Sequence, residues 1–250
     1  TGKIKGKHMA ERNYTDEHQD NGHRKYRYDT DVLMRPYMLT SFQPWLREGA
    51  ALEMGCYVGD FTEIFLQQFR DLTVVEAAPE LVEATRKRVG DGVEFFVDTF
   101  EAVALPRKYD NIFLVHTLEH LDDRQLVLRR IRSWLSGGGR FFVAVPNANA
   151  PSRQIAVKMG LIEHNAAVTE GERLHGHRIT YSLDTLESEV RQVGFKVVHR
   201  GGVLFKPLAN FQLDKALELG VISKEFMDGC YALGMQYPDL CSSIYLVCEA

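Results

Sequence analysis

The sequence predicts an α/β protein built on a doubly wound, mostly parallel sheet. Short apolar runs typical of buried strands alternate with segments whose apolar spacing is typical of helices. The run at 111–115 is apolar on both faces, as expected of a central parallel strand. The first run passes through a glycine turn, Gly55 to Gly59, directly into a helical pattern. The expected strands are 50–54, 72–76, 93–97, 111–115, 140–146, 195–199 and 241–248.

The N-terminal part divides into three segments. Residues 1–9 have the composition of a vector remnant, so a single domain is expected over 10–250, with a helical cap at 10–48. Residues 13–28 are polar and rich in tyrosine, which fits a surface arm. Residues 32–46 have the spacing of an amphipathic helix interrupted near Pro36 and Pro44.

The glycine turn is the first candidate ligand site. Gly55 permits a positive φ, and Gly59 removes a side chain where the helix start must approach a ligand or a strand. The next strand ends at Glu76, about 20 residues after the first glycine, where nucleoside-binding folds place an acid for the ribose hydroxyls. Tyr57 stands where a dinucleotide fold needs a glycine beside the pyrophosphate, so a cofactor without phosphates fits better.

Polar residues follow the third and fourth strands at the same edge. Asp98, Thr99 and Phe100 come directly after 93–97, where open α/β sheets bind ligands, although Asp98 would also serve as a helix N-cap. The strand at 111–115 leads to His116, Glu119 and His120, which are expected in the cleft.

Two insertions interrupt the alternation of strands and helices. Residues 147–180 contain no strong strand and hold His164, His175 and His177, which is typical of a lid or substrate loop. Residues 202–240 form a second insertion with helices at 210–219 and 224–233. Other expected features are helices at 79–90, 124–135 and 182–193 and a turn at 137–139.

The combination of these motifs resembles the class I S-adenosylmethionine-dependent methyltransferases over about residues 48 to 200. It consists of Glu53-x-Gly55-x-x-x-Gly59, the acid Glu76, the acid Asp98 and the segment 109–121. The Leu-Glu-His at 118–120 is similar to the ubiquinone-biosynthesis and sugar or secondary-metabolite branch.

The resemblance implies a fold, a cofactor and its ligands. The Rossmann-like sheet would have the order 3-2-1-4-5-7-6 with its last strand antiparallel. The cofactor would be S-adenosyl-L-methionine, with S-adenosyl-L-homocysteine as product. An acid after the third strand would face the adenine, and a tyrosine of the N-terminal arm would close over the cofactor. The expected cofactor-binding residues are Tyr14, Glu53, Gly55, Gly59, Glu76, Asp98, Thr99, Phe100 and His116.

Methyl transfer to a hydroxyl also needs a base, and imidazole suits that task near neutral pH. His177 and His120 are the candidates best placed to face an acceptor. Glu119 would orient one of them or pair with Arg124. A magnesium site built from Asp122, Asp123 and these histidines lacks a recognisable carboxylate spacing, so no metal is expected.

Composition restricts the partners. The net charge of −4 gives no electrostatic reason to expect nucleic acid or an anionic membrane. The expected acceptor is a small molecule enclosed by the insertions, such as a sugar, nucleotide-sugar or secondary metabolite methylated on oxygen or nitrogen. A cytoplasmic protein is the default, and a homodimer is compatible with the sequence. The four cysteines form no CxxC pair and are expected to be reduced thiols.

Two alternatives stay open at this stage. An NAD-dependent oxidoreductase uses a similar sheet, although Tyr57 argues against it. A non-catalytic binding protein would keep the fold without the chemistry.

Overall fold

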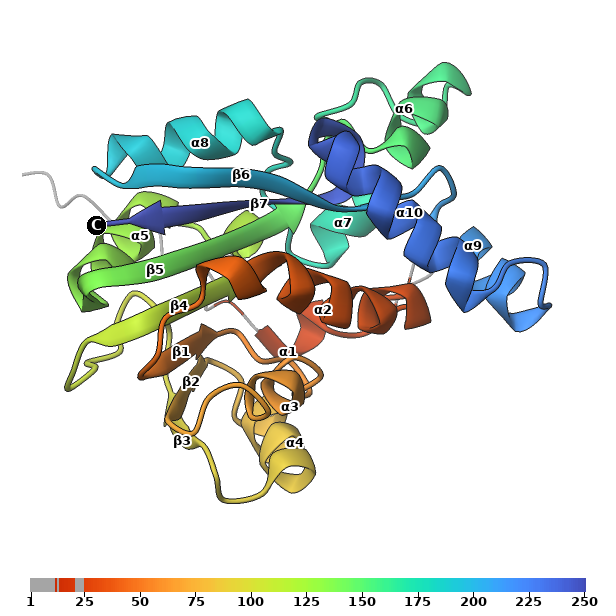
Figure 1. Cartoon of the computed structure of the whole chain (residues 1–250). Helices are drawn as coiled ribbons and strands as arrows, with labels where there is room; N and C mark the ends of the chain where they lie inside the picture. The colour runs from red at the N-terminus through yellow and green to blue at the C-terminus, as the bar shows by residue number, and fades with distance from the viewer. Residues whose placement is uncertain (1–11, 13, 21–24) are drawn as a thin grey trace, which may run out of the picture.

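A computed structural model describes residues 12, 14–20 and 25–250, which form one seven-stranded sheet with helices on both faces (Figure 1). The sheet order β3-β2-β1-β4-β5-β7-β6 confirms the predicted order. β7 runs antiparallel to β5 and to β6, and the other pairs are parallel. The strands are β1 (Ala51–Met54), β2 (Leu72–Glu76), β3 (Glu94–Val97), β4 (Tyr109–Val115), β5 (Leu135–Pro146), β6 (Lys196–Phe205) and β7 (Cys241–Glu249).

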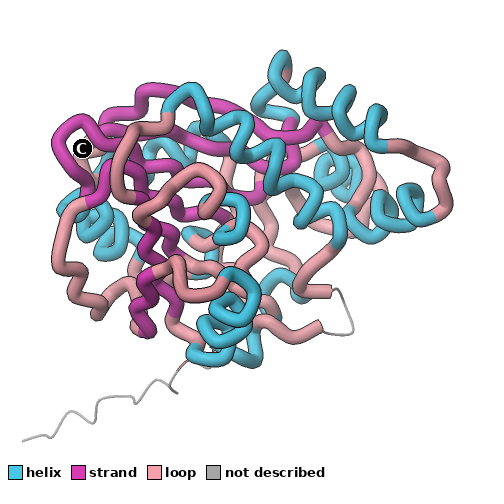
Figure 2. Tube along the Cα trace, turned by 60° about the horizontal axis from the view of Figure 1, so that its bottom comes forward, coloured by secondary structure: helices cyan, strands magenta, loops and turns pink. Residues whose placement is uncertain are grey.

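Two apolar cores hold the helices against opposite faces of this sheet. One core packs α5 (Arg124–Trp134) and α8 (Leu183–Gln192) onto the sheet through residues such as Ile131 and Leu186. The other packs α2 (Asp29–Phe42), α3 (Thr62–Phe65), α9 (Asn210–Glu218) and α10 (Lys224–Gln236). Figure 2 shows the strands running between these helices. The helical cover on both faces explains why the central strands are apolar throughout.

The N-terminal cap differs from expectation at one proline. α2 continues through Pro36 without interruption, and only the 3₁₀ turn η1 (Gln43–Trp45) coincides with Pro44. Pro36 is exposed, whereas Met34, Met38 and Phe42 on the same helix are buried against the sheet. This packing compensates for the hydrogen bond that the proline cannot donate. The short helix α1 (Tyr14–Glu17) precedes α2, and the suggested vector remnant at 1–9 lies outside the described residues.

Two strands are longer than the sequence suggested. The glycines at 137–139 belong to β5 and do not form a separate turn. Leu135 pairs with Tyr109 and Arg140 with Asn111, so the residues between bulge out of the ladder. β6 does not end at 199 but continues to Phe205, because its pairing with β7 extends as far as Cys241. The first residues of the expected second insertion, from 202, are therefore strand.

The remaining helices lie at the carboxyl edge of the sheet or along its flank. α4 (Pro79–Val89) follows β2, and η2 (Leu118–His120) follows β4. The segment 147–180, the predicted lid, contains α6 (Pro151–Lys158) and α7 (Glu170–Leu174). A bridge between Asn147 and Tyr181 joins the two ends of this segment. The last turn, η3 (Pro238–Leu240), leads into β7.

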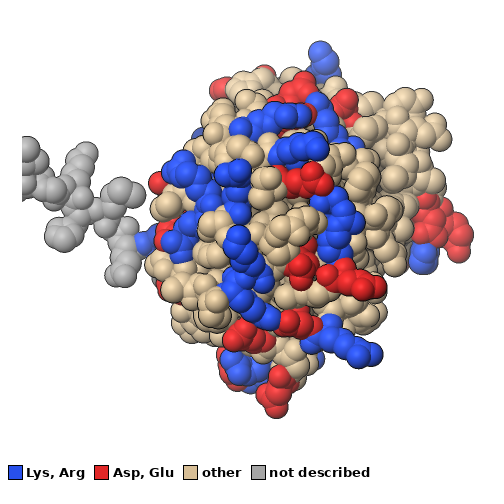
Figure 3. All heavy atoms as spheres, turned by 60° about the vertical axis from the view of Figure 1, so that its left-hand side comes forward, with Lys and Arg blue, Asp and Glu red and all other residues tan. Residues whose placement is uncertain are grey.

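The face shown in Figure 3 carries basic and acidic side chains side by side. Ion pairs among the described surface residues include Arg107 with Asp71 and Arg200 with Glu187. Such mixed charges create no strong field of one sign over that face. In the part of the chain that the structure describes, every helix is too short or too polar to cross a membrane.

Candidate active site

A cavity of about 680 Å³ opens at the carboxyl edge of the sheet. Its size suits a small molecule or a cofactor with a small acceptor. The ends of β1, β2 and β4 form its floor, and α2, the lid segment 147–180 and the start of α9 form its walls. The cavity thus lies where open parallel sheets bind ligands.

Gly55 and Gly59 are both required by the turn after β1, for different reasons. Gly55 has a φ of +85°, and a Cβ there would lie 2.8 Å from Oγ1 of Thr117. Gly59 has a φ of +84°, and its Cβ would lie 2.8 Å from Cγ2 of Thr85 on α4. Gly55 lines the cavity, whereas Gly59 does not. The sequence predicted a ligand or a strand next to Gly59, whereas the structure places the helix α4 there.

The side chain of Glu76 points back to this turn. One carboxylate oxygen accepts from the backbone nitrogens of Cys56 (3.2 Å) and Tyr57 (3.4 Å), and the other accepts from Ala78 (3.1 Å). The residue is buried and lines the cavity. Burial raises its pKa, and the backbone donors oppose that shift. Glu76 is thus held rigidly beside the cavity, as a ligand for ribose hydroxyls would need to be.

Glu53 lies one residue before the end of β1 and, like Glu76, lines the cavity. Its carboxylate accepts from Thr62 Oγ1 at 2.7 Å. Burial raises the pKa of Glu53 to about 8, so the group is mostly protonated at neutral pH. It reaches the cavity floor as a neutral acid.

The residues after β3 are only partly in the cavity. Thr99 and Phe100 line it. Asp98 is exposed and outside the lining, and its carboxylate accepts from the backbone nitrogen of Thr99 at 2.8 Å. In the described structure β3 is followed by a loop that leads to β4 without a helix, so the alternative role of Asp98 as a helix N-cap is wrong. The adenine role of Asp98 stays a prediction.

His116 is the first residue after β4 and has a φ of +51°. Its Nε2 lies 2.8 Å from Oγ of Ser243 on β7. The ring lines the cavity, and burial holds its pKa well below the usual value near 6.5. His116 is therefore a neutral, fixed imidazole at the cavity floor.

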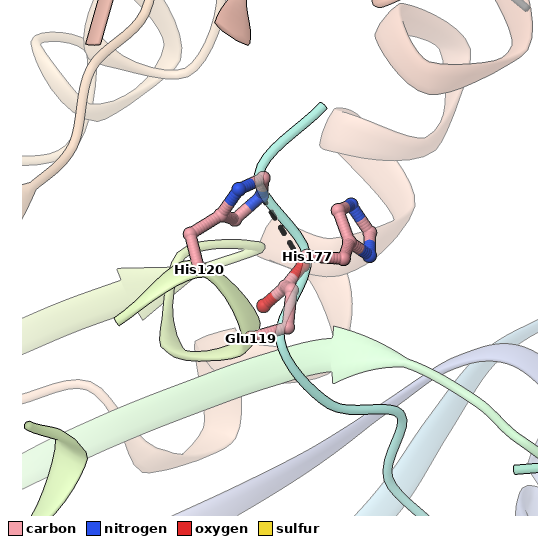
Figure 4. A group of neighbouring side chains, drawn as sticks. All are labelled: Glu119, His120 and His177. Carbon is pink, nitrogen blue, oxygen red and sulfur yellow. Dashed lines mark ion pairs between the residues drawn. The ribbon is translucent and has the colours of Figure 1, made fainter. Parts of the chain in front are cut away.

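Glu119, His120 and His177 come together although 57 residues separate the last two (Figure 4). The histidine rings meet edge to face with centroids 4.5 Å apart. Arg178 donates its backbone N–H to the carbonyl of Glu119, which fixes the lid segment beside η2. His120 Nε2 lies 4.0 Å from Glu119 Oε1, too far for a hydrogen bond. Glu119 therefore does not orient His120 through a hydrogen bond.

Glu119 also does not pair with Arg124, which binds Glu189 at 2.9 Å. Neither carboxylate oxygen of Glu119 hydrogen-bonds to a described residue, although both are buried. Burial raises the pKa of Glu119 to about 8 and lowers that of His120 well below 6.5. Glu119 and His120 are thus both largely uncharged near neutral pH.

The acidic residues considered for magnesium are engaged elsewhere. Asp122 pairs with Arg12 and Arg178, and Asp123 accepts from the backbone nitrogen of Leu126 as the N-cap of α5. Among the described residues, the group close enough to hold a metal ion is Glu119, His120 and His177, whose ligand atoms lie within 4.8 Å of one another. The expectation of no metal is untested.

The N-terminal arm covers part of the cavity, and two of its residues do so in different ways. Tyr14 lines the cavity and lies under the guanidinium of Arg12, 4.8 Å from the ring centroid. Tyr26 also lines it, and its ring contacts Tyr57 at 5.0 Å and His175 at 5.2 Å between centroids. The sequence singled out Tyr14, but a tyrosine-rich segment gives no signal that distinguishes one ring from another.

Arg35 on α2 is a cavity residue that the sequence did not reveal. Among the described residues its guanidinium hydrogen-bonds only to Sδ of Met38, at 3.8 Å, and pairs with no carboxylate. Burial lowers its pKa, while Asp31, Asp60 and Glu53 oppose that shift. The sequence held no clue to Arg35, because one arginine in an amphipathic helix usually faces solvent.

Residues 23–200 match the family described as methyltransferase domain. The chain belongs to this family. The methyltransferase is 26% identical over 64% of its length to a ubiquinone biosynthesis O-methyltransferase of Xanthomonas euvesicatoria, of which the match covers 67%. It is 30% identical over 36% of its length to a malonyl-[acyl-carrier protein] O-methyltransferase of Ilyobacter polytropus, of which the match covers only 35%.

Solved structures confirm the fold of the methyltransferase. A possible histamine N-methyltransferase from Thermotoga maritima superposes with a TM-score of 0.58 at 19% identity, covering 88% of each chain. A glycopeptide N-methyltransferase in complex with S-adenosylmethionine gives 0.55 at 17% identity, covering 84% of this chain and 85% of the other. Together with the sequence motifs, the family identifies the protein as a class I S-adenosylmethionine-dependent methyltransferase.

The residues present fit this cofactor. Gly55 leaves bare backbone beside the cavity, and the buried carboxylate of Glu76 can accept hydrogen bonds from a ribose diol. When bound, the sulfonium supplies an activated methyl group for displacement. Glu76 would hold the ribose, Thr99 and Phe100 would adjoin the base, and His116 would adjoin the reactive end. The family match also favours a methyltransferase over the oxidoreductase and non-catalytic alternatives.

Proposed function

We propose that this methyltransferase transfers a methyl group to an oxygen or nitrogen of a small molecule, such as a sugar, nucleotide-sugar or secondary metabolite. The single observation that carries the proposal is the composition of the cavity. Its floor presents Gly55, Glu76 and His116, and its far wall presents lid residues such as Arg153 and His177. One enclosed space thus offers a place for the donor and a separate place for an acceptor.

The order of strands along the sheet edge supports an orientation for the donor. The edge runs β3, β2, β1, β4, and these strands end near Thr99, Glu76, Gly55 and His116 respectively. An elongated nucleoside with its base at β3 and its ribose at β2 would reach the end of β4 with its sulfur. The transfer would then take place between His116 and the lid.

Arg35 extends this arrangement to the amino-acid part of the cofactor. It is a cation in the cavity wall without a described carboxylate partner, and its charge affects the pKa values of Glu53 on β1 and His116 after β4. We assign it to the carboxylate of the methionine moiety, because a charged hydrogen bond in a partly buried site is favourable. Arg35→Met should weaken S-adenosylhomocysteine binding at least tenfold, measured by calorimetry. An unchanged dissociation constant would contradict this assignment.

The acceptor would lie against the histidines of η2 and the lid. His120 and His177 both line the cavity, and Lys206 and Asn210 line it at the start of α9. These polar groups favour an acceptor rich in hydroxyl or other hydrogen-bonding groups. The O-methyltransferases among the curated relatives support an oxygen acceptor, and the (S)-coclaurine N-methyltransferase among them leaves nitrogen open.

The experiment that tests this function measures donor and acceptor separately. S-Adenosylhomocysteine should raise the melting temperature, and NAD should not. Methyl-tritiated S-adenosylmethionine should then label at least one member of a panel of catechols, sugars, nucleotide-sugars and amines. Stabilisation by NAD alone, or binding of the donor without transfer to any panel member, would count against the proposal.

Glu76 provides the most direct single-residue test of the donor site. Glu76→Gln should weaken S-adenosylhomocysteine binding about 10- to 100-fold, because a hydrogen bond to a charged group contributes about 1.5–3 kcal/mol. Glu83→Gln on the exposed side of α4 is the matched control and should bind normally. Equal affinities of the two variants would remove Glu76 from the donor site.

A further inference from the structure

His116 has an unusual backbone for its residue type. It lies at φ +51°, a left-handed conformation that costs free energy for any residue with a Cβ. The conformation is held by a backbone hydrogen bond from His116 to the carbonyl of Ala144 on β5, at 2.8 Å. Strain of this kind persists where the surrounding structure imposes it, and it is concentrated at functional sites. Here it directs an imidazole into the cavity.

The ring of His116 is fixed through one nitrogen only. Nε2 lies 2.8 Å from Oγ of Ser243, and Ser243 is itself held in β7 opposite Pro146 and Val203. The other nitrogen, Nδ1, hydrogen-bonds to no described residue. In the tautomer that carries its proton on Nε2, Nε2–H donates a hydrogen bond to the hydroxyl of Ser243 and Nδ1 keeps its lone pair. In that tautomer, Nδ1 is a proton acceptor on a ring that lines the cavity.

The other candidate histidines have a less suitable position. His120 and His177 contact each other edge to face above the buried Glu119 (Figure 4). His120 is four residues further from the strand end than His116. His116 alone of the three follows directly from β4, the strand next to β1 and its glycine turn. It therefore lies at the strand end beside the proposed donor site.

We propose that His116 is the catalytic base, and that the acceptor is a hydroxyl. This rests on the proposed function. The acceptor oxygen forms its bond to the methyl carbon while the carbon–sulfur bond breaks with its electron pair going to sulfur. The hydroxyl proton moves to Nδ1 of His116, and the imidazolium later releases it to water when the product leaves. His120 and His177 then contact the acceptor without taking the proton.

The surroundings of His116 favour the neutral ring in the resting enzyme. The charged or titratable groups that face it are Arg35 on α2, His120 on η2 and His177 on the lid segment, and Ser243 faces it from β7. Burial and then the Arg35 guanidinium hold the pKa of His116 well below its usual value. The ring of His116 is therefore neutral at neutral pH, so it can accept a proton from the acceptor hydroxyl without first releasing one of its own.

Two substitutions test the base while keeping the backbone. His116→Gly and His116→Asn both tolerate a positive φ, so both should fold. Both should still bind S-adenosylhomocysteine, and turnover is therefore compared at saturating donor concentration. With a hydroxyl acceptor from the panel, kcat should fall about 100-fold or more. Added imidazole should restore part of the activity of His116→Gly.

The matched control is His164→Asn, which changes an exposed histidine of the lid segment outside the cavity lining. It should retain full turnover and show no response to imidazole. A readout independent of turnover is the tautomer of His116, which ¹⁵N NMR of histidine-labelled protein reports. An unprotonated Nδ1 is expected in the complex with S-adenosylhomocysteine.

The outcomes separate this inference from the proposed function. If the wild type labels hydroxyl acceptors and His116→Gly keeps its kcat, His116 is not the base although the methyltransferase function stands. A protonated Nδ1, or labelling of amine acceptors alone, also overturns the inference. If the wild type neither binds S-adenosylhomocysteine nor labels any acceptor, the proposed function and the base fail together.

Discussion

Glu119 carries a carboxyl group buried beside two histidines without a described hydrogen-bond partner. Its pKa in the folded protein is about 8, raised from 4.5 by burial. At pH values between 4.5 and about 8, Glu119 is therefore mostly protonated in the folded state and mostly ionised in the unfolded state. The stability that the neutral acid contributes is fully present below pH 4.5 and is lost as the pH rises through about 8.

Glu119→Gln should therefore change the dependence of stability on pH. Near pH 5 the variant and the wild type should melt at similar temperatures. At pH 9 the variant should be more stable, by up to on the order of 4 kcal/mol, because it avoids a buried negative charge. Thermal melts across this range test the prediction, with the exposed Glu83→Gln as control. If the difference in stability between Glu119→Gln and the wild type did not change with pH, Glu119 would not be a buried acid with a raised pKa.

At the scale of elements, the packing of the glycine turn against α4 depends on Gly59. Gly59→Ala would impose a positive φ on alanine and bring its Cβ to 2.8 Å from Cγ2 of Thr85. It should lower the free energy of unfolding by roughly 2–4 kcal/mol, the sum of backbone strain and overpacking. Chemical denaturation measures this change.

Gly220→Ala at the C-terminal end of α9 is the matched control. Gly220 also has a positive φ, +66°, but a Cβ there would meet no atom within 4 Å. Only the backbone cost, about 1–2 kcal/mol, should appear. The double variant Gly59→Ala with Thr85→Ser should recover part of the loss, because serine lacks the methyl group. Equal losses at Gly59 and Gly220 would contradict the packing argument.

At the scale of the whole molecule, the N-terminal arm joins the lid through ion pairs and ring contacts. Arg12 binds Glu17 at 2.7 Å, donates to the carbonyl of His120 at 2.8 Å and pairs with Asp122 at 3.2 Å. Asp122 in turn binds Arg178 of the lid segment. Segments distant in the sequence thus close one side of the cavity together.

Arg12→Ala should weaken the contacts between the N-terminal arm and the lid segment. Hydrogen exchange in residues 170–178 should become faster, and S-adenosylhomocysteine should dissociate several-fold faster, since the arm covers the cavity. Arg191→Ala, which removes an exposed ion pair with Glu187 on α8, should change neither. Unchanged exchange in the Arg12 variant would show that the arm does not restrain the lid.

Much of the fold could be predicted because it follows from patterns within short segments of the sequence. The strand at 111–115, the glycine turn and Glu76 lie as predicted because apolar periodicity and backbone freedom are properties of short segments. The sequence-based predictions were wrong where packing or pairing with another element determined the local structure. β6 continues to Phe205 because β7 pairs with it, and α2 passes through Pro36 because its buried face packs on the sheet.

The sequence by itself predicted the strand order through its resemblance to a known class, and the structure confirms that order. Gly55, Glu76 and their spacing also predicted a donor site, which stays a prediction. Only the tertiary structure brought His177 to His120, placed Arg35 and Tyr26 in the cavity wall, and fixed His116 against Ser243. These contacts join residues far apart in the chain. Their geometry depends on how helices, lid and sheet pack together, which no spacing within one segment encodes.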